Sequence, residues 1–157
     1  MGPRLLLNPS LQAVVLIRFA IAGPRSLHWF WRNILIWKHS IEVMYRPLIG
    51  PGLLLPHPFG ITIAKGVRIG RGVTIMHLVS IGANLGSSEV PVIGDGVVVF
   101  AHSMIFGAVE IGSRSLIGAG ACVDFDVPAG GVVRGPRSEL RERGAEILLR
   151  RTRLDRE

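Results

Sequence analysis

Aliphatic residues recur at every sixth position of this chain for sixty residues. Of the eleven positions from 63 to 123 that lie six apart, ten hold Ile or Val, and only Ser87 departs. The ten are Ile63, Ile69, Ile75, Ile81, Ile93, Val99, Ile105, Ile111, Ile117 and Val123. A fixed short period is typical of repeat proteins. Six residues are too few for a helical repeat, so the period confines the chain to very short repeating units.

Each unit is predicted to form one short strand and one turn. In Ile69–Thr74 and Ile117–Cys122 the first residue is aliphatic, the second is Gly, and the fifth is Val or Ala. β-Branched residues suit a half-buried strand, and Gly tolerates tight turns. Strands this short favour a β-solenoid, in which successive coils stack and the recurring aliphatics fill a central column.

The pattern over roughly residues 41–137 resembles that of the hexapeptide-repeat acyltransferases. The resemblance implies an all-β solenoid, a left-handed parallel β-helix with three hexads in each coil. Its left hand comes from the resemblance alone, because parallel crossovers are normally right-handed. The family also implies a homotrimer, which agrees with a hydrophobic content of 48% in a 157-residue chain.

The chain is predicted to have three segments: N-terminal helices over 1–40, the β-helix acyltransferase domain over 41–128, and a C-terminal tail and helix over 129–157. Asn8 can cap a first helix, which Gly23 and Pro24 end, and a second helix runs to about Lys38. The last strand is expected near Val127, and the C-terminal helix over 138–151. The irregular stretch between Ile81 and Ile93 is expected to be a loop that replaces whole hexads.

Four aromatic residues cluster on the second predicted helix, namely Trp29, Phe30, Trp31 and Trp37. One interpretation is that they pack the helix pair against the first coil. The alternative is an interfacial helix that contacts a membrane peripherally, flanked by Arg25, Arg32 and Lys38. The first interpretation is preferred.

The formal net charge of +7 does not by itself indicate nucleic-acid binding. The basic residues are dispersed outside the C-terminal run 134–156, and the repeats lack interleaved aromatic and basic residues. An anionic cofactor or a membrane surface explains the charge equally well. The apolar stretch 11–22 is too short to span a bilayer and is interrupted by Arg18, so a cytoplasmic protein is expected.

His57 departs from the repeat. It stands six residues before Ile63, where the period would place an aliphatic, and Pro56 and Pro58 flank it. Departures of this kind tend to be functional or strained. A turn histidine that satisfies backbone groups is the structural alternative.

The segment Ile49–Gly82 resembles the catalytic half of serine O-acetyltransferases. Ile49-Gly50-Pro51-Gly52 matches the family's Ile-Gly-x-Gly element, Leu55–Gly60 its Leu-Asp-His-Ala-Thr-Gly element, and Ile75–Gly82 its Ile-Leu-Gln-Ser-Val-Thr-Leu-Gly element. The resemblance implies that His57 is the general base and that Glu42 is its carboxylate partner. It implies an acetyl-CoA-dependent O-acetyltransferase in which the acceptor hydroxyl attacks the thioester directly.

The resemblance also places the pantetheine arm of acetyl-CoA beside Ala101 and Ala119, with Arg134 and Arg137 as candidates for its phosphates. The sequence differs from the family in several ways. Glu stands at position 42 where the family has Asp, and Glu89-Val90-Pro91 replaces a substrate-binding Asp-Arg-His-Pro element. The sequence given has the 1–40 segment before the coils, where the family has a large N-terminal helical domain. The acceptor is therefore serine-like, or a sugar or polysaccharide.

Alternatives to this interpretation remain. His77 and His102 compete with His57 for the catalytic role, and His77 is the preferred alternative. A non-catalytic hexapeptide scaffold or a membrane-associated assembly protein is the alternative function. No motif for a metal ion is found.

Overall fold

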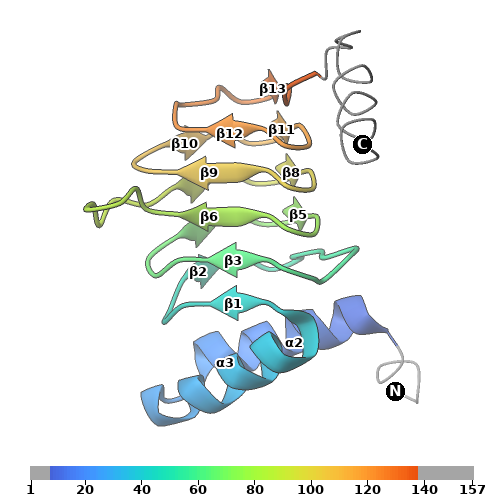
Figure 1. Ribbon diagram of the computed structural model, residues 1–157, viewed down its shortest axis with the longest axis vertical. Coiled ribbons are helices and arrows are strands. Elements are labelled where there is room, and N and C mark those ends of the chain that lie inside the picture. Colours follow the sequence, from blue (N-terminus) through green and yellow to red (C-terminus); the bar gives the residue numbers. More distant parts are fainter. Residues whose placement is uncertain (1–7, 138–157) are drawn as a thin grey trace, which may run out of the picture.

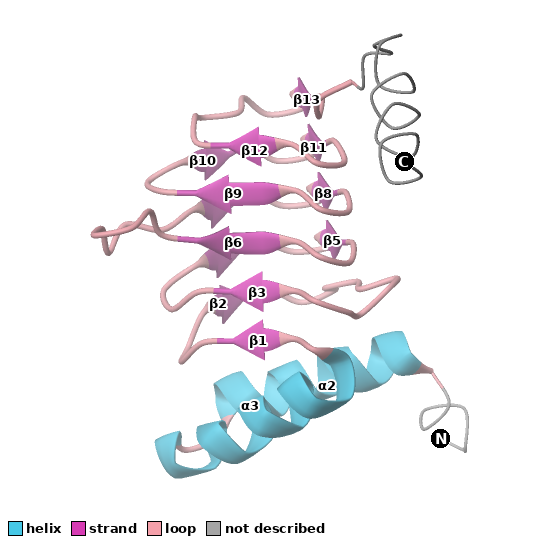
Figure 2. Ribbon diagram, in the orientation of Figure 1, coloured by secondary structure: helices cyan, strands magenta, loops and turns pink. Residues whose placement is uncertain are grey.

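The computed structural model describes residues 8–137, which form a stack of short coils closed at one end by two helices (Figure 1). Helix α2 spans Pro9–Ala22 and helix α3 spans Arg25–His39. Every strand is only two or three residues long, and loops join the strands at three corners (Figure 2). The chain is therefore a β-solenoid, as the six-residue period predicts.

The strands form three parallel sheets, here named A, B and C. Sheet A contains β1 (Glu42–Val43), β3 (Thr62–Ile63), β6 (Ser80–Gly82), β9 (Met104–Phe106) and β12 (Cys122–Val123). Sheet B contains β2 (Leu48–Ile49), β4 (Arg68–Ile69), β7 (Val92–Ile93) and β10 (Glu110–Ile111). Sheet C contains β5 (Thr74–Ile75), β8 (Val98–Val99), β11 (Leu116–Ile117) and β13 (Val132–Val133).

The coil is left-handed. In Figure 1 the strands of sheet A face the viewer and point to the left, while the chain climbs from α3 to β13. A chain that moves leftward in front as it climbs winds in the left-handed sense. The fold implied by the resemblance is therefore confirmed for the described residues.

The predicted aliphatic column is the core of the solenoid. All ten residues of the six-residue series are at most 4% exposed. A second column, two residues before the first, is buried beside it and includes Val67, Val73, Val97 and Ala121. Alternate residues of a strand point to the same face. Each two-residue strand thus contributes one inward side chain, and the turn before it contributes the other.

The helix pair covers the first coil with small and aliphatic side chains. Ala13, Ile17 and Ala20 of α2 and Leu35 of α3 are at most 1% exposed. The guanidinium of Arg18 donates hydrogen bonds to the carbonyls of Ile49 and Gly50, which fixes α2 to sheet B. Within 8–137 no helix is both long and apolar enough to cross a membrane.

The preferred interpretation of the aromatic cluster is wrong for three of its four residues. Trp29 is 68% exposed, Phe30 is 47% exposed and Trp37 is 88% exposed, whereas Trp31 packs partly against the core. The last turn of the helix directs Leu35 and His39 inward, so the solenoid is closed by residues smaller than indole rings. The aromatic face of α3 is left outside.

Two other expectations concern the ends and the irregular loop. The solenoid continues past Val127, because β13 pairs with β11 five residues later, so the expected end of the last strand is wrong. The loop between β6 and β7 adds one whole hexad and preserves the register, as predicted: Ser80 to Val92 spans twelve positions, whereas Thr62 to Arg68 spans six. The expected C-terminal helix lies outside the described residues.

Candidate active-site edge

His57 lies in an extended turn between sheets C and A. From Leu54, which bridges to Thr74 in sheet C, to Thr62 in sheet A is eight positions. The equivalent corners of the next coils, such as Thr74 to Ser80, take six positions. The two additional residues push the turn outward from the corner just before β3 (Figure 1).

The additional residues change the interpretation of His57. Leu55 fills the core position of this coil with no exposed surface, while His57 is exposed. The prediction that His57 occupies an aliphatic position of the repeat is therefore wrong. His57 stands on an insertion, where a side chain can reach solvent and a substrate.

Neighbouring coils hold the turn in place. The amide of Gly60 donates to the carbonyl of His39 below at 3.3 Å, and the amide of Leu78 above donates to the carbonyl of Phe59 at 2.9 Å. Gly60 has a φ of +65°, and a Cβ atom there would lie 2.4 Å from a methyl carbon of Leu78. Glycine is thus favoured at this point by the left-handed backbone conformation, and a larger residue would also have to displace the Leu78 side chain.

Three histidines from successive coils form a column at this edge. The ring centroids of His57 and His77 are 5.7 Å apart, and those of His77 and His102 are 5.6 Å apart, both pairs in edge-to-face geometry. His57 and His102 are exposed, whereas His77 between them is partly buried. The Nδ1 atom of His77 is buried and has no hydrogen-bond partner within the described residues.

A fourth histidine lies beneath the column. His39 is 6% exposed at the end of α3, and its carbonyl supports Gly60. Burial is the main cause that lowers the pKa of His39 below the ordinary value of 6.5, and nearby Lys38 lowers this pKa further. A hydrogen bond with the backbone of Pro58 opposes these effects. The neutral imidazole of His39 therefore underlies the turn that presents His57.

The structure does not join Glu42 to His57. Glu42 lies on β1, and its carboxylate forms an ion pair with the guanidinium of Arg32 on α3. Both side chains are about one-third exposed. No hydrogen bond between Glu42 and His57 occurs among the described residues. In this structure Glu42 contacts Arg32 and His57 contacts His77, so the two residues of the predicted dyad have different partners.

The residues expected to bind the cofactor lie farther along the same edge. The amide of His102 donates to the carbonyl of His77, and the amide of Gly120 donates to the carbonyl of Ala101. Beyond them, Gly135 packs so closely on Ala119 that an added Cβ atom would lie 1.8 Å from the Ala119 carbonyl oxygen. The edge therefore carries the three histidines and, in its later coils, the small residues Ala101 and Ala119.

Arg134 and Arg137 follow β13 at the far end of this edge, and both are exposed. Their neighbour Gly135 makes the contact with Ala119, so Arg134 starts from the corner where the small residues lie. The structure thus brings His57, His77, Ala101, Ala119 and Arg134 to one edge of the solenoid.

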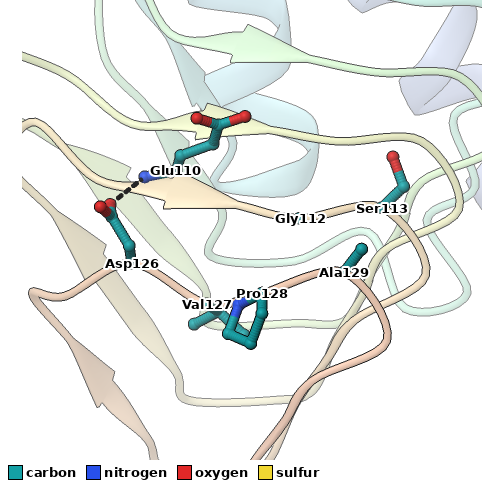
Figure 3. A pocket seen from close by; sticks show the side chains of 7 residues that line it. All are labelled: Glu110, Gly112, Ser113, Asp126, Val127, Pro128 and Ala129. Carbon is teal, nitrogen blue, oxygen red and sulfur yellow. Dashed lines mark hydrogen bonds between the residues drawn. The ribbon is translucent and has the colours of Figure 1, made fainter.

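Two hollows among the described residues lie away from the histidine column. One, of about 500 Å³, is lined by Glu110, Ser113, Asp126 and their neighbours near the last coil (Figure 3). There the carboxylate of Asp126 accepts a hydrogen bond from the amide of Glu110 at 2.7 Å. Another, of about 470 Å³, lies over sheet B. Neither of these two hollows is lined by a histidine.

Sequence reasoning singled out His57 and His77 separately but missed that His102 stacks with them. The signal was available in the spacing. His77 and His102 fall two and three residues after Ile75 and Val99, so both follow the sheet C strand of their coil. Residues 8–137 contain no group of three or more His, Cys, Asp or Glu side chains arranged to hold a metal ion.

The hexad period, the left-handed coil and the inserted histidine turn define a hexapeptide-repeat β-helix protein. Sequence comparison finds a serine acetyltransferase of Helicobacter pylori that is 32% identical over 141 residues, covering 86% of this chain and 82% of that protein. A serine acetyltransferase of Buchnera aphidicola is 35% identical over 121 residues. This chain therefore belongs to the serine acetyltransferase family. No family model matches the chain.

Solved structures agree with this assignment. Soybean serine acetyltransferase in complex with serine superposes with a TM-score of 0.77 at 29% identity, over 88% of this chain and 60% of that one. The Neisseria gonorrhoeae enzyme in complex with serine gives a TM-score of 0.73 at 28% identity. The chain spans 44% of the Buchnera protein and 56% of a Mycobacterium tuberculosis relative, so it corresponds to about half of these longer proteins.

Proposed function

We propose that this chain is an acetyl-CoA-dependent O-acetyltransferase that acts on a small hydroxyl compound. The observation that carries the proposal is the inserted turn of His57, which exposes an imidazole on the edge that also holds Ala101 and Ala119. Membership of the serine acetyltransferase family supports the reaction type. A cytoplasmic location, where acetyl-CoA is available, is part of the proposal.

His57 is the proposed general base. Its imidazole takes the proton from the acceptor hydroxyl while the hydroxyl oxygen attacks the thioester carbonyl. The carbon–sulfur bond then breaks, the acetyl group stays on the acceptor as an ester, and the CoA sulfur receives a proton. An imidazole suits this transfer because its ordinary pKa lies near neutral pH. No acyl-enzyme is formed in this scheme.

Glu42 is the proposed carboxylate partner. A carboxylate beside a catalytic imidazole selects its tautomer and stabilises the imidazolium that forms. Glu42 has a longer side chain than the Asp of the family, and Arg32 neutralises its charge. His77 is the alternative base, since it contacts His57 and has an unpartnered ring nitrogen.

Ala101 and Ala119 are proposed to face the pantetheine arm of acetyl-CoA. Small side chains leave room for a narrow chain to lie against the coil. Arg134 and Arg137 are proposed to pair with its phosphates, because guanidinium groups suit phosphate recognition. Both arginines are exposed and therefore available to a ligand.

A homotrimer is proposed to complete the site. An exposed edge cannot exclude water from a reacting thioester by itself, whereas a neighbouring coil packed against it can. Large apolar side chains remain exposed on the solenoid, including Leu48 at 63%, Phe59 at 55% and Leu54 at 50%. A ring-forming contact between copies would cover such side chains.

The test measures free CoA when the protein is incubated with acetyl-CoA and single acceptors. Serine is the first acceptor, and simple sugars and oligosaccharides form the second group. Mass spectrometry should show an added acetyl group on the accepted compound, and His57→Ala should lose this product. If no hydroxyl compound releases CoA above the rate of spontaneous hydrolysis, the chain is a non-catalytic scaffold and the proposal fails.

The comparison of acceptors decides the substrate class. Serine is the compound bound in the soybean and Neisseria structures. This chain has Glu89-Val90-Pro91 where the family has its substrate-binding histidine. If the protein transfers acetyl groups to sugars but not to serine, the replacement of that histidine by Glu89-Val90-Pro91 would explain the choice of acceptor.

A further inference from the structure

Helix α3 presents an apolar surface that the solenoid does not use. The α3 aromatic face consists of five exposed residues, Leu27, Trp29, Phe30, Ile36 and Trp37, whose exposed fractions range from 36% to 88%. The opposite side of the helix is buried through His28, Leu35 and His39. One side of α3 is thus buried in the fold, and the opposite side exposes apolar side chains to solvent.

The aromatic rings on this surface are supported from below. Trp31 stacks on Phe19 of α2 with ring centroids 5.0 Å apart, and Phe30 meets Trp31 edge-to-face at the same distance. Trp31 itself packs against the core. Phe30 is therefore held in place by a chain of ring contacts that reaches α2.

The charges around this surface have one sign. The sequence contains no Asp or Glu before Glu42, while Arg18, Arg25, Arg32 and Lys38 fall within α2 and α3. Arg18 is bound to backbone carbonyls and Arg32 is paired with Glu42. Arg25 and Lys38 are exposed at the two ends of α3. A partner for this surface must accept apolar side chains and supply negative charge.

We propose that the α3 aromatic face binds the surface of an anionic lipid bilayer, with α3 lying in the plane of the interface. Trp is enriched where hydrocarbon meets headgroups. Interfacial helices combine an apolar face with flanking Lys and Arg, which attract anionic lipids. The same surface of a second copy suits it less well, because that surface carries the same cations and its nearest carboxylate, Glu42, is already paired with Arg32.

Fluorescence gives a direct test, because all three tryptophans of the chain, Trp29, Trp31 and Trp37, lie on α3. The full chain is mixed with vesicles of phosphatidylcholine alone or with 30–50% phosphatidylglycerol, roughly the anionic content at which such helices bind. The emission should move to shorter wavelength, and the protein should float, only with the anionic vesicles. Both effects should weaken as salt rises, since exposed charges are screened.

Variants separate the apolar and charged contributions. Phe30→Ser with Trp37→Ser should abolish flotation without unfolding the chain, because both side chains are exposed. The matched control is Leu85→Ser with Phe125→Ser, which removes side chains of comparable exposure, 107% and 51%, from the solenoid and should float normally. Arg25→Gln with Lys38→Gln should weaken binding about 25-fold, from roughly fivefold for each charge.

The inference stands apart from the proposed activity. His57→Ala should float like the unchanged protein while losing acetyl transfer, so either proposal can fail alone. The inference is overturned if the unchanged protein neither floats nor changes its emission at low salt, or if it binds neutral vesicles equally well. It is also overturned if Phe30→Ser with Trp37→Ser splits a larger assembly into smaller ones and vesicles have no effect, since the surface then joins copies of this chain.

Discussion

The imidazole of His57 meets the imidazole of His77 edge-to-face, with ring centroids 5.7 Å apart. The two residues belong to adjacent coils, and the inserted turn before β3 brings His57 over His77. The predicted partner Glu42 has no such contact with His57, because its carboxylate is paired with Arg32. The ring that contacts the proposed base in the described part of the chain is therefore a second histidine.

The first prediction concerns His57. His57→Ala should reduce acetyl transfer about 10²–10⁴-fold, the usual contribution of a general base. Binding of acetyl-CoA, measured by calorimetry, should survive because Ala101 and Ala119 lie on other coils. The thermal midpoint should change little, since the side chain is exposed. Retention of full turnover in this variant would remove His57 from the mechanism.

The second prediction concerns His77 as a positioning residue. An edge-to-face ring pair contributes about 0.5–1.5 kcal/mol, which corresponds to roughly two- to tenfold in rate if the contact orients His57. His77→Ala should therefore lower kcat by about this factor and displace the pH dependence of kcat, while KM for the acceptor stays constant. His102→Ala is the matched control, because His102 contacts His77 rather than His57. If His77→Ala abolishes turnover and His57→Ala does not, His77 is the base.

The third prediction concerns the ion pair. Glu42→Gln should lower acetyl transfer, but by less than His57→Ala, because the imidazole stays in place and loses only its orienting charge. Arg32→Gln keeps the carboxylate and should leave transfer within a few-fold of the unchanged protein. Chemical denaturation should show both variants destabilised by about 1 kcal/mol or less, as expected for a partly exposed pair. Equal loss of activity in both variants would mean that Glu42 acts only through the ion pair.

The repeat could be predicted from sequence because its cause is local. Each aliphatic residue of the series points into the same column, so the period of six is enough to predict the solenoid. From the sequence, the inserted turn could be located only as a break in the six-residue spacing. The distance from Leu55 to Ile63 is eight positions rather than six, which marks two additional residues, but the sequence alone does not say which residue moves outward. In the structure Leu55 is buried and His57 is exposed, so the turn after Leu55 is the part that moves outward.

The pairing of charges and rings could not be predicted because it depends on the angle between α3 and the first coil. That angle sets Arg32 beside Glu42 and turns Trp29 and Trp37 away from the solenoid. Aromatic residues on a helix next to a core suggest burial, yet Leu35 and small residues of α2 already fill the space. The periodicity of the sequence does not reveal which of these side chains fills the space between the helices and the first coil.

The fourth prediction concerns assembly. Sedimentation should give a mass three times the chain mass of 17.0 kDa, with little monomer at micromolar concentration. Specific activity should fall on dilution as trimers dissociate, because the proposed site is completed by a neighbouring copy. Sedimentation at each assay concentration should show whether the loss of activity coincides with the loss of trimer. A monomer with undiminished specific activity would contradict the proposed site.

The fifth prediction concerns pH and the buried His39. Because burial lowers the pKa of His39 in the folded chain, the unfolded chain binds a proton at this residue more readily than the folded chain does. The stability from the neutral side chain is therefore complete above about pH 6.5 and is lost as the pH falls through the lower folded value. The thermal midpoint should fall between pH 7.5 and 5, and His39→Leu should show a smaller fall over the same range. The matched control His102→Leu changes an exposed histidine and should retain the full dependence. An undiminished fall in His39→Leu would assign the acid sensitivity to other groups.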